Sequence, residues 1–111
     1  RGAPRCRAAP GRRLSVKVRW SDAARQDRLA IFETVCEDAP MAALALDERF
    51  GEAAATLARF PMMGRAGLVP GTRELIPHEN YRLVYEIDET AQIVWVLALV
   101  HVARLWPTAQ P

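Results

Sequence analysis

Three side chains in the second half of the sequence could together act on a phosphate ester. Arg73 and Arg82 stand in two strand-like runs, and His101 follows the longest apolar run of the chain. The planar guanidinium of arginine can hold a phosphate through two parallel hydrogen bonds. Histidine titrates near neutral pH and can act as a proton donor or acceptor. Such a set would suit metal-independent RNA cleavage, in which the arginines stabilise the pentavalent phosphate and His101 protonates the leaving 5′-oxygen.

Two further residues could bind the RNA, and each candidate has a structural alternative. Tyr85 could stack on a base, although its alternation with apolar residues favours core packing. Arg65, in a Gly-Arg-Ala-Gly loop, could contact an anion or anchor its own loop. Arg82 could be a solvated strand residue paired with Glu74 or Glu86, and the histidine could be a structural hydrogen-bonding group at a strand end. The residue types alone leave both interpretations open.

The positive charge of the chain is confined to its beginning. Residues 1–15 hold five of the 15 basic side chains and no acid, so the remaining residues carry ten basic and 13 acidic side chains. The body is therefore mildly acidic, which weakens the case for nucleic-acid binding through bulk charge. Residues 1–13 lack an apolar pattern, and we expect a disordered Arg-rich tail or a non-native extension there. No apolar stretch reaches about 18 residues, so no membrane span is expected.

The two cysteines point to a reducing compartment. Cys6 and Cys36 are far apart in the sequence and form neither a metal-ligand pattern nor a disulfide framework. We therefore expect a cytoplasmic protein with no metal and no cofactor.

Apolar periodicity predicts the elements that must position these side chains. A second helix is the best patterned of them, because one face carries Ala43, Leu46, Phe50, Ala53, Leu57 and Phe60. The full prediction is a strand at 14–20, helices at 22–37 and 40–60, a loop at 61–72, and strands at 73–76, 81–87 and 92–100. The fold class is thus α+β, in the order β-α-α-β-β-β. We expect a four-stranded, mostly antiparallel sheet with a helix hairpin on one face, in a single domain over residues 14–107.

This arrangement assigns the candidate site to the sheet face that the helices leave open. Arg82 alternates with Tyr81 and Tyr85, so it leaves the sheet on the face opposite these aromatic residues. With the helices on the aromatic face, Arg82 should point to solvent. We expect Arg73 beside it and His101 at the end of the same surface.

Several short motifs occur in an order that resembles the RelE/ParE superfamily of bacterial type II toxins. The motifs are Pro61-Met-Met-Gly-Arg65, Gly71-Thr-Arg-Glu-Leu75, Tyr81-Arg-Leu-Val-Tyr85, Ile93 to Leu99, and His101 through Arg104, Trp106 and Pro107. The resemblance extends over residues 16–107. It implies a cytoplasmic growth-arrest toxin of the kind that stabilises plasmids, held in a hetero-oligomer by an antitoxin encoded beside it. The RelE branch cleaves mRNA on the ribosome, and the ParE branch poisons DNA gyrase.

The residue types and the resemblance together indicate the site residues, and Arg104 is indicated by the resemblance alone. Arg73, Arg82 and His101 are the candidate catalytic residues, and Arg65, Tyr85 and Arg104 are the candidate substrate-binding residues. The sequence departs from the RelE pattern in its basic cluster, because the chain has one lysine, Lys17, in the first predicted strand. Since some relatives use a glutamate with a histidine, an acid such as Glu74 or Glu79 could act with His101.

Three functions remain open on this basis. A ribosome-dependent endoribonuclease is favoured by the two arginines and the histidine. A non-enzymatic inhibitor of DNA gyrase is favoured by the acidic body and the missing lysines. A degenerate toxin retained for antitoxin binding is the third.

Overall fold

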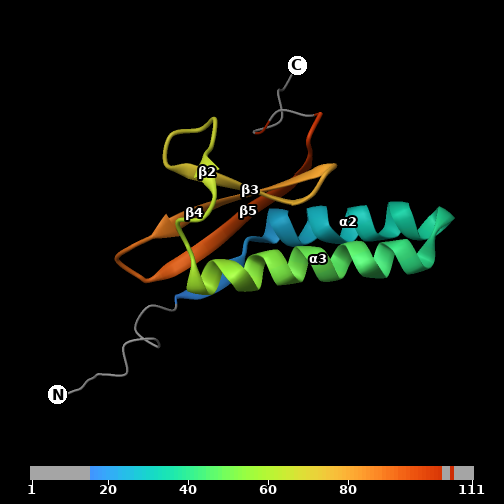
Figure 1. Cartoon of the computed structure of the whole chain (residues 1–111), viewed down its shortest axis with the longest axis horizontal. Coiled ribbons are helices and arrows are strands. Elements are labelled where there is room, and N and C mark those ends of the chain that lie inside the picture. Colours follow the sequence, from blue (N-terminus) through green and yellow to red (C-terminus); the bar gives the residue numbers. More distant parts are fainter. Residues whose placement is uncertain (1–15, 104–105, 107–111) are drawn as a thin grey trace.

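The computed structural model describes residues 16–103 and Trp106. The predicted tail at 1–13, Cys6 and Arg104 lie outside the described residues. The elements are β1 (Lys17–Trp20), α2 (Asp22–Asp38), α3 (Pro40–Arg59), β2 (Arg65–Ala66), β3 (Thr72–His78), β4 (Tyr81–Asp88) and β5 (Ile93–His101). None of the helices in the described part is long and apolar enough to cross a membrane. Figure 1 shows α2 and α3 lying side by side along one face of the sheet.

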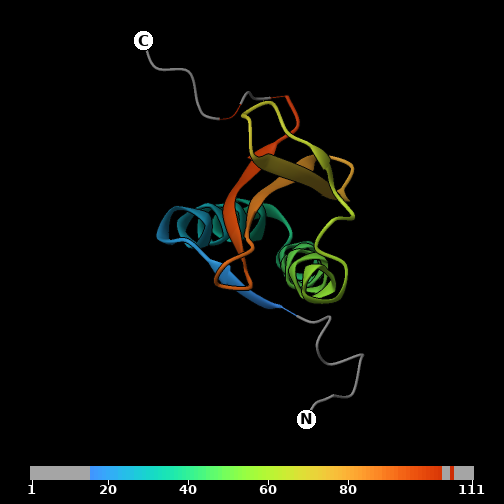
Figure 2. The same ribbon diagram turned by 90° about the vertical axis from the view of Figure 1, so that its left-hand side faces the viewer.

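The sheet has five strands in the order β1-β5-β4-β3-β2, one more than predicted. β1 is parallel to β5, and the other pairs are antiparallel. The additional strand, β2, lies within the predicted loop and pairs two residues with β3. A two-residue strand is too short to give an alternating pattern, which is why the sequence did not predict it. In Figure 2 this strand and its loop lie on the side of the sheet away from the helices.

The helix hairpin forms as its sequence predicts and covers the sheet. The Ser21 side chain accepts a hydrogen bond from the Ala24 N–H (3.0 Å) and caps α2, while Pro40 occupies the first turn of α3. The core-facing residues of α3 are Ala43, Leu46, Phe50, Ala54 and Leu57. The prediction that the apolar face of this helix continues to Phe60 was wrong. Phe60 caps the C-terminus of α3 and is 55% exposed.

A β-bulge in β5 directs apolar side chains to both faces of the sheet. Val84 lies opposite Ala98 and Tyr85 lies opposite Val96, so Leu97 is an extra residue in β5. Val94, Val96 and Leu99 therefore join the core under the helices, whereas Ala98 and Val100 pack with Val84 and Trp106 on the other face. The face that we expected to be open thus has an apolar cluster of its own.

Helix α2 takes the place of a strand along the second half of β5. β1 ends opposite Val96, and beyond that point the Asp27 carboxylate accepts a hydrogen bond from the Leu99 N–H (3.1 Å). Burial raises the pKa of Asp27 above its ordinary value, and this hydrogen bond lowers it by a smaller amount. The side chain thus satisfies a backbone donor that a neighbouring strand would otherwise pair.

Candidate functional site

The three predicted catalytic residues do not gather on one surface. Arg82 shares the face of Val84, away from the helices, as its alternation with Tyr81 and Tyr85 indicated. Arg73 lies opposite Tyr85 and leaves the sheet on the helix side. His101 is also on the helix side, because it lies opposite Tyr81 and contacts that ring edge-on, with 5.5 Å between the ring centroids. The expectation that all three share the open face was therefore wrong.

An irregularity in the β3–β4 pairing explains the position of Arg73. His78 pairs with Tyr81, but Leu75 pairs with Leu83, so β3 contains one more residue than β4 over this interval. If the hairpin continued regularly from the His78–Tyr81 pair, Arg73 would lie opposite Glu86. Its side chain would then point to the same face as Arg82. One extra residue reverses the side to which every later side chain points.

Arg82 is held in a buried ion pair. Its Nη1 donates to Glu74 Oε2 at 2.7 Å, and the Arg82 and Glu74 side chains are only 8% and 6% exposed. Arg65 reaches the other oxygen of Glu74 at 3.4 Å, with 68% of its side chain exposed. The suggested partner, Glu74, is correct, but the prediction of a solvated Arg82 was wrong. Among the described residues, the single negative charge of Glu74 balances the buried guanidinium of Arg82. The positive charge of Arg65, which also contacts Glu74, lies at the surface.

Tyr85 and Arg73 together hold the backbone of the loop that follows α3. The buried Tyr85 hydroxyl donates to the Pro61 carbonyl at 2.8 Å and accepts from the Gly64 N–H at 2.9 Å. Arg73 Nη1 donates to the carbonyls of Met62, at 3.3 Å, and Gly64. Burial raises the pKa of Tyr85, more than the Gly64 hydrogen bond and the Arg73 charge lower it, so the hydroxyl stays a neutral donor. Tyr85 is buried and not placed to stack on a base, whereas Arg73 is partly buried and its Nη1 is engaged by the loop.

Gly64 is required at the centre of this arrangement. A Cβ atom there would lie 2.6 Å from the Tyr85 hydroxyl oxygen and 2.7 Å from the Glu74 carbonyl oxygen. Both distances are shorter than a carbon–oxygen contact allows. The Pro-Met-Met-Gly-Arg and Tyr-Arg-Leu-Val-Tyr motifs are therefore joined by packing and hydrogen bonds, which the sequence pattern did not reveal.

His101 is exposed at the end of β5, far along the sheet from both Arg73 and Lys17. Its Nδ1 accepts from the Ala103 N–H at 3.1 Å, so the neutral ring carries its proton on Nε2. Arg73 and His101 pair with residues of β4 that are four positions apart, which separates them by about 13 Å along the strand. Lys17 lies opposite Ile93, about 25 Å from His101 along β5.

The two glutamates considered as partners of His101 are placed differently. Glu74 is on the opposite face of the sheet, and Glu79 is an exposed residue of the β3–β4 turn. Within the described ranges, no three His, Cys, Asp or Glu side chains are grouped so that they could hold a metal ion.

Comparisons with known proteins agree with this fold. The family model described as ParE toxin of type II toxin–antitoxin system matches residues 18–106. The chain belongs to the ParE toxin family. It is also similar to Y4kP of Sinorhizobium fredii, which is named as a toxin, with 32% identity over 92 residues that cover 82% of this chain and 93% of that protein.

Solved structures share the architecture of this ParE-family chain. The chromosomal ParDE toxin–antitoxin system of P. aeruginosa contains a chain similar to it with a TM-score of 0.70 and 20% identity, covering 78% of this chain and 96% of that one. A chain of the RelBE2 toxin–antitoxin complex of Mycobacterium tuberculosis is similar with a TM-score of 0.57 and 26% identity, covering 78% of this chain and 98% of that one. The YoeB/ParE toxin of Agrobacterium tumefaciens is similar with a TM-score of 0.56 and 16% identity, covering 77% of this chain and 96% of that one. The predicted family and fold class are thus confirmed, with the strand count corrected.

Proposed function

We propose that this ParE-family toxin arrests growth by binding and inhibiting DNA gyrase, and that it does not cleave mRNA. The observation that carries the proposal is the separation of Arg73, Arg82 and His101 described above. Arg82 belongs to a buried ion pair on one face of the sheet, and Arg73 is occupied by loop carbonyls on the other.

RNA cleavage without a metal requires charges fixed around the scissile phosphate. Such preorganised donors contribute most when they already point to the place where charge develops, and a displacement of about 1 Å lowers the rate about a hundredfold. Here His101 and Arg73 are about 13 Å apart along β4. Arg82 is next to Tyr81, the residue opposite His101, but its side chain leaves the sheet on the other face. To bring Arg82 to the phosphate, Glu74 would have to remain buried without its closest cation, which is strongly unfavourable.

The comparisons support the same choice. The matching family is named for ParE, and the P. aeruginosa ParDE structure is more similar in fold, with a TM-score of 0.70, than the RelBE2 complex at 0.57. Since both structures come from toxin–antitoxin systems, we also propose a cognate antitoxin as partner, in the cytoplasm. The acidic body of the chain fits a protein target better than a nucleic acid.

Two assays on the same preparation test the proposal. Purified bacterial gyrase with relaxed plasmid measures inhibition of supercoiling, and translating ribosomes with a defined mRNA measure cleavage. We expect inhibition of supercoiling and intact mRNA. His101→Ala should keep full inhibition, because the exposed ring contacts no residue that the proposal requires. Cleaved mRNA without gyrase inhibition would establish the nuclease instead, and the absence of both activities would favour the degenerate toxin.

A further inference from the structure

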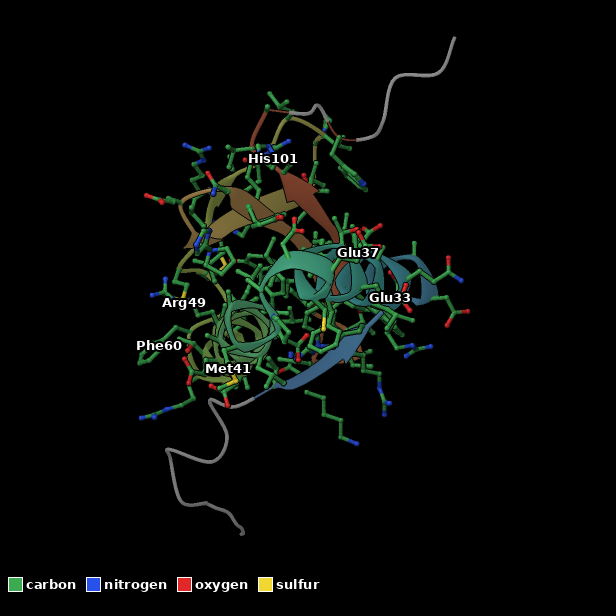
Figure 3. All side chains as sticks on the ribbon, turned by 90° about the vertical axis from the view of Figure 1, so that its right-hand side faces the viewer. Glu33, Glu37, Met41, Arg49, Phe60 and His101 are labelled. Atoms are coloured by element: carbon green, nitrogen blue, oxygen red, sulfur yellow. The ribbon has the colours of Figure 1, made fainter. Side chains whose placement is uncertain are left out.

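A tight turn after α3 exposes three large apolar side chains within four residues. The Met63 N–H donates to the Phe60 carbonyl at 3.1 Å, which closes a four-residue turn with Pro61 at its second position. Phe60, Met62 and Met63 are 55%, 59% and 50% exposed. We call this segment the Phe60–Met63 turn. Figure 3 shows the Phe60 side chain pointing outward from α3.

The backbone of the Phe60–Met63 turn is fixed at every residue. The Phe60 N–H donates to Thr56 at 2.9 Å, and its carbonyl accepts from Met63. The carbonyls of Pro61 and Met62 accept from Tyr85 and Arg73, as described above. The protein therefore uses a buried tyrosine and an arginine to hold a segment whose own large side chains remain in solvent.

Positive charge borders this apolar surface. The Arg59 guanidinium lies over the Phe60 ring, 5.6 Å from its centroid, and the exposed Arg65 follows the turn by two residues. The acid that pairs with Arg65, Glu74, is buried and also bound to Arg82. An apolar centre with a basic border complements an apolar pocket with an acidic rim.

We propose that the Phe60–Met63 turn is the element of this toxin that enters a pocket on its protein target; the inference rests on the proposed inhibition of gyrase. Binding energy in interfaces concentrates in a few large side chains that fill pockets, and a rigid backbone avoids the cost of ordering a loop. The two methionines can adapt to the pocket wall. A turn with a fixed backbone and exposed apolar side chains suits a pocket on a folded enzyme, whereas the extended arm of an antitoxin binds grooves and sheet edges.

Paired variants test the proposal in the supercoiling assay. Met62→Ser combined with Met63→Ser removes the apolar side chains, and Met41→Ser is the matched control, because Met41 is 76% exposed in the first turn of α3. We expect the double variant to raise the half-inhibitory concentration about tenfold or more and the control to leave it unchanged. Arg59→Glu should weaken inhibition, while Arg49→Glu, on the same helix, should not. The double variant, Met41→Ser and Arg49→Glu should keep the wild-type thermal midpoint, since these side chains are exposed. Arg59→Glu puts an acid in the last turn of α3 and should lower the midpoint by a few degrees, so its inhibition is compared at matched folded protein.

The results separate this proposal from the proposed function. If the wild-type toxin inhibits gyrase and the double variant inhibits it equally, the turn is not the contact element, and the gyrase assignment stands. If the double variant loses capture by the antitoxin encoded beside the toxin gene but still inhibits gyrase, the turn is an antitoxin site and the proposal is overturned. If the wild-type toxin does not inhibit gyrase at all, both proposals fail.

Discussion

Removal of one oxygen atom, in Tyr85→Phe, should loosen the segment that follows α3. The Tyr85 hydroxyl is the only side-chain group in the described structure that bonds both the Pro61 carbonyl and the Gly64 N–H. A phenylalanine ring fills the same space in the core, so the variant changes hydrogen bonding and leaves packing almost intact.

The expected loss of unfolding free energy depends on the two backbone groups that lose their hydrogen-bond partner, the Gly64 N–H and the Pro61 carbonyl. Gly64 is buried, and an unsatisfied buried donor costs about 1–3 kcal/mol. Pro61 is only half-buried, so water can replace part of its lost bond, which contributes about 0.5–1 kcal/mol. The free energy of unfolding should therefore fall by about 2–3 kcal/mol. For a domain of this size, the thermal midpoint should fall by about 10–20 °C.

Thermal unfolding followed by circular dichroism measures the fall in the thermal midpoint. Hydrogen exchange of the Gly64 amide measures the loosening of the segment after α3. Tyr81→Phe is the matched control, because the Tyr81 hydroxyl makes no hydrogen bond within the part of the chain that the structure describes, and its midpoint should change little. A Tyr85→Phe protein that unfolds within about 2 °C of the wild type, with a protected Gly64 amide, would refute this account of the loop.

Three further predictions concern other residues. Arg82→Ala leaves the buried Glu74 without its closest cation and should lower the free energy of unfolding by about 3 kcal/mol or more, whereas Arg65→Ala, at an exposed site, should cost about 1 kcal/mol or less; urea titration measures both. Because the pKa of Asp27 is raised in the folded state, the native protein binds the proton more tightly, and stability should fall as the pH rises from about 4 through that raised pKa. Asp27→Asn should remove this dependence while still accepting the backbone hydrogen bond, as unfolding measured at several pH values would test. Deletion of residues 1–13 should leave the thermal midpoint within a few degrees of the full chain, since they show no apolar pattern.

The long periodic segments made the fold predictable from the sequence. α3 and β4 carry apolar residues at a regular spacing, and both lie within two residues of their predicted bounds. The bulge in β5, by contrast, could not be predicted from the spacing of apolar residues. Every position from Ile93 to Val100 is apolar, so no alternation marks Leu97 as the bulge.

The candidate site was not predictable, because it depends on strand register. The sequence correctly put Arg82 on the face away from the helices. The side to which Arg73 points depends on one extra residue between Leu75 and His78, and nothing in the residue types there marks it. The burial of Arg82 was missed for a related reason, since the apolar cluster on its face results from the bulge in β5.

The parallel pairing of β1 with β5 determines when during synthesis this protein can complete its fold. Lys17 pairs with Ile93, 76 positions later, so the first described strand has no partner until the last strand has been made. At about 5–20 residues per second, that interval is about 4–15 s. Throughout it, β1 lacks its strand partner and α2 lacks the strand against which it mainly packs, because both contact β5. A nascent chain truncated before β5 therefore lacks the strand that contributes Val94, Val96 and Leu99 to the core, and it cannot close that core.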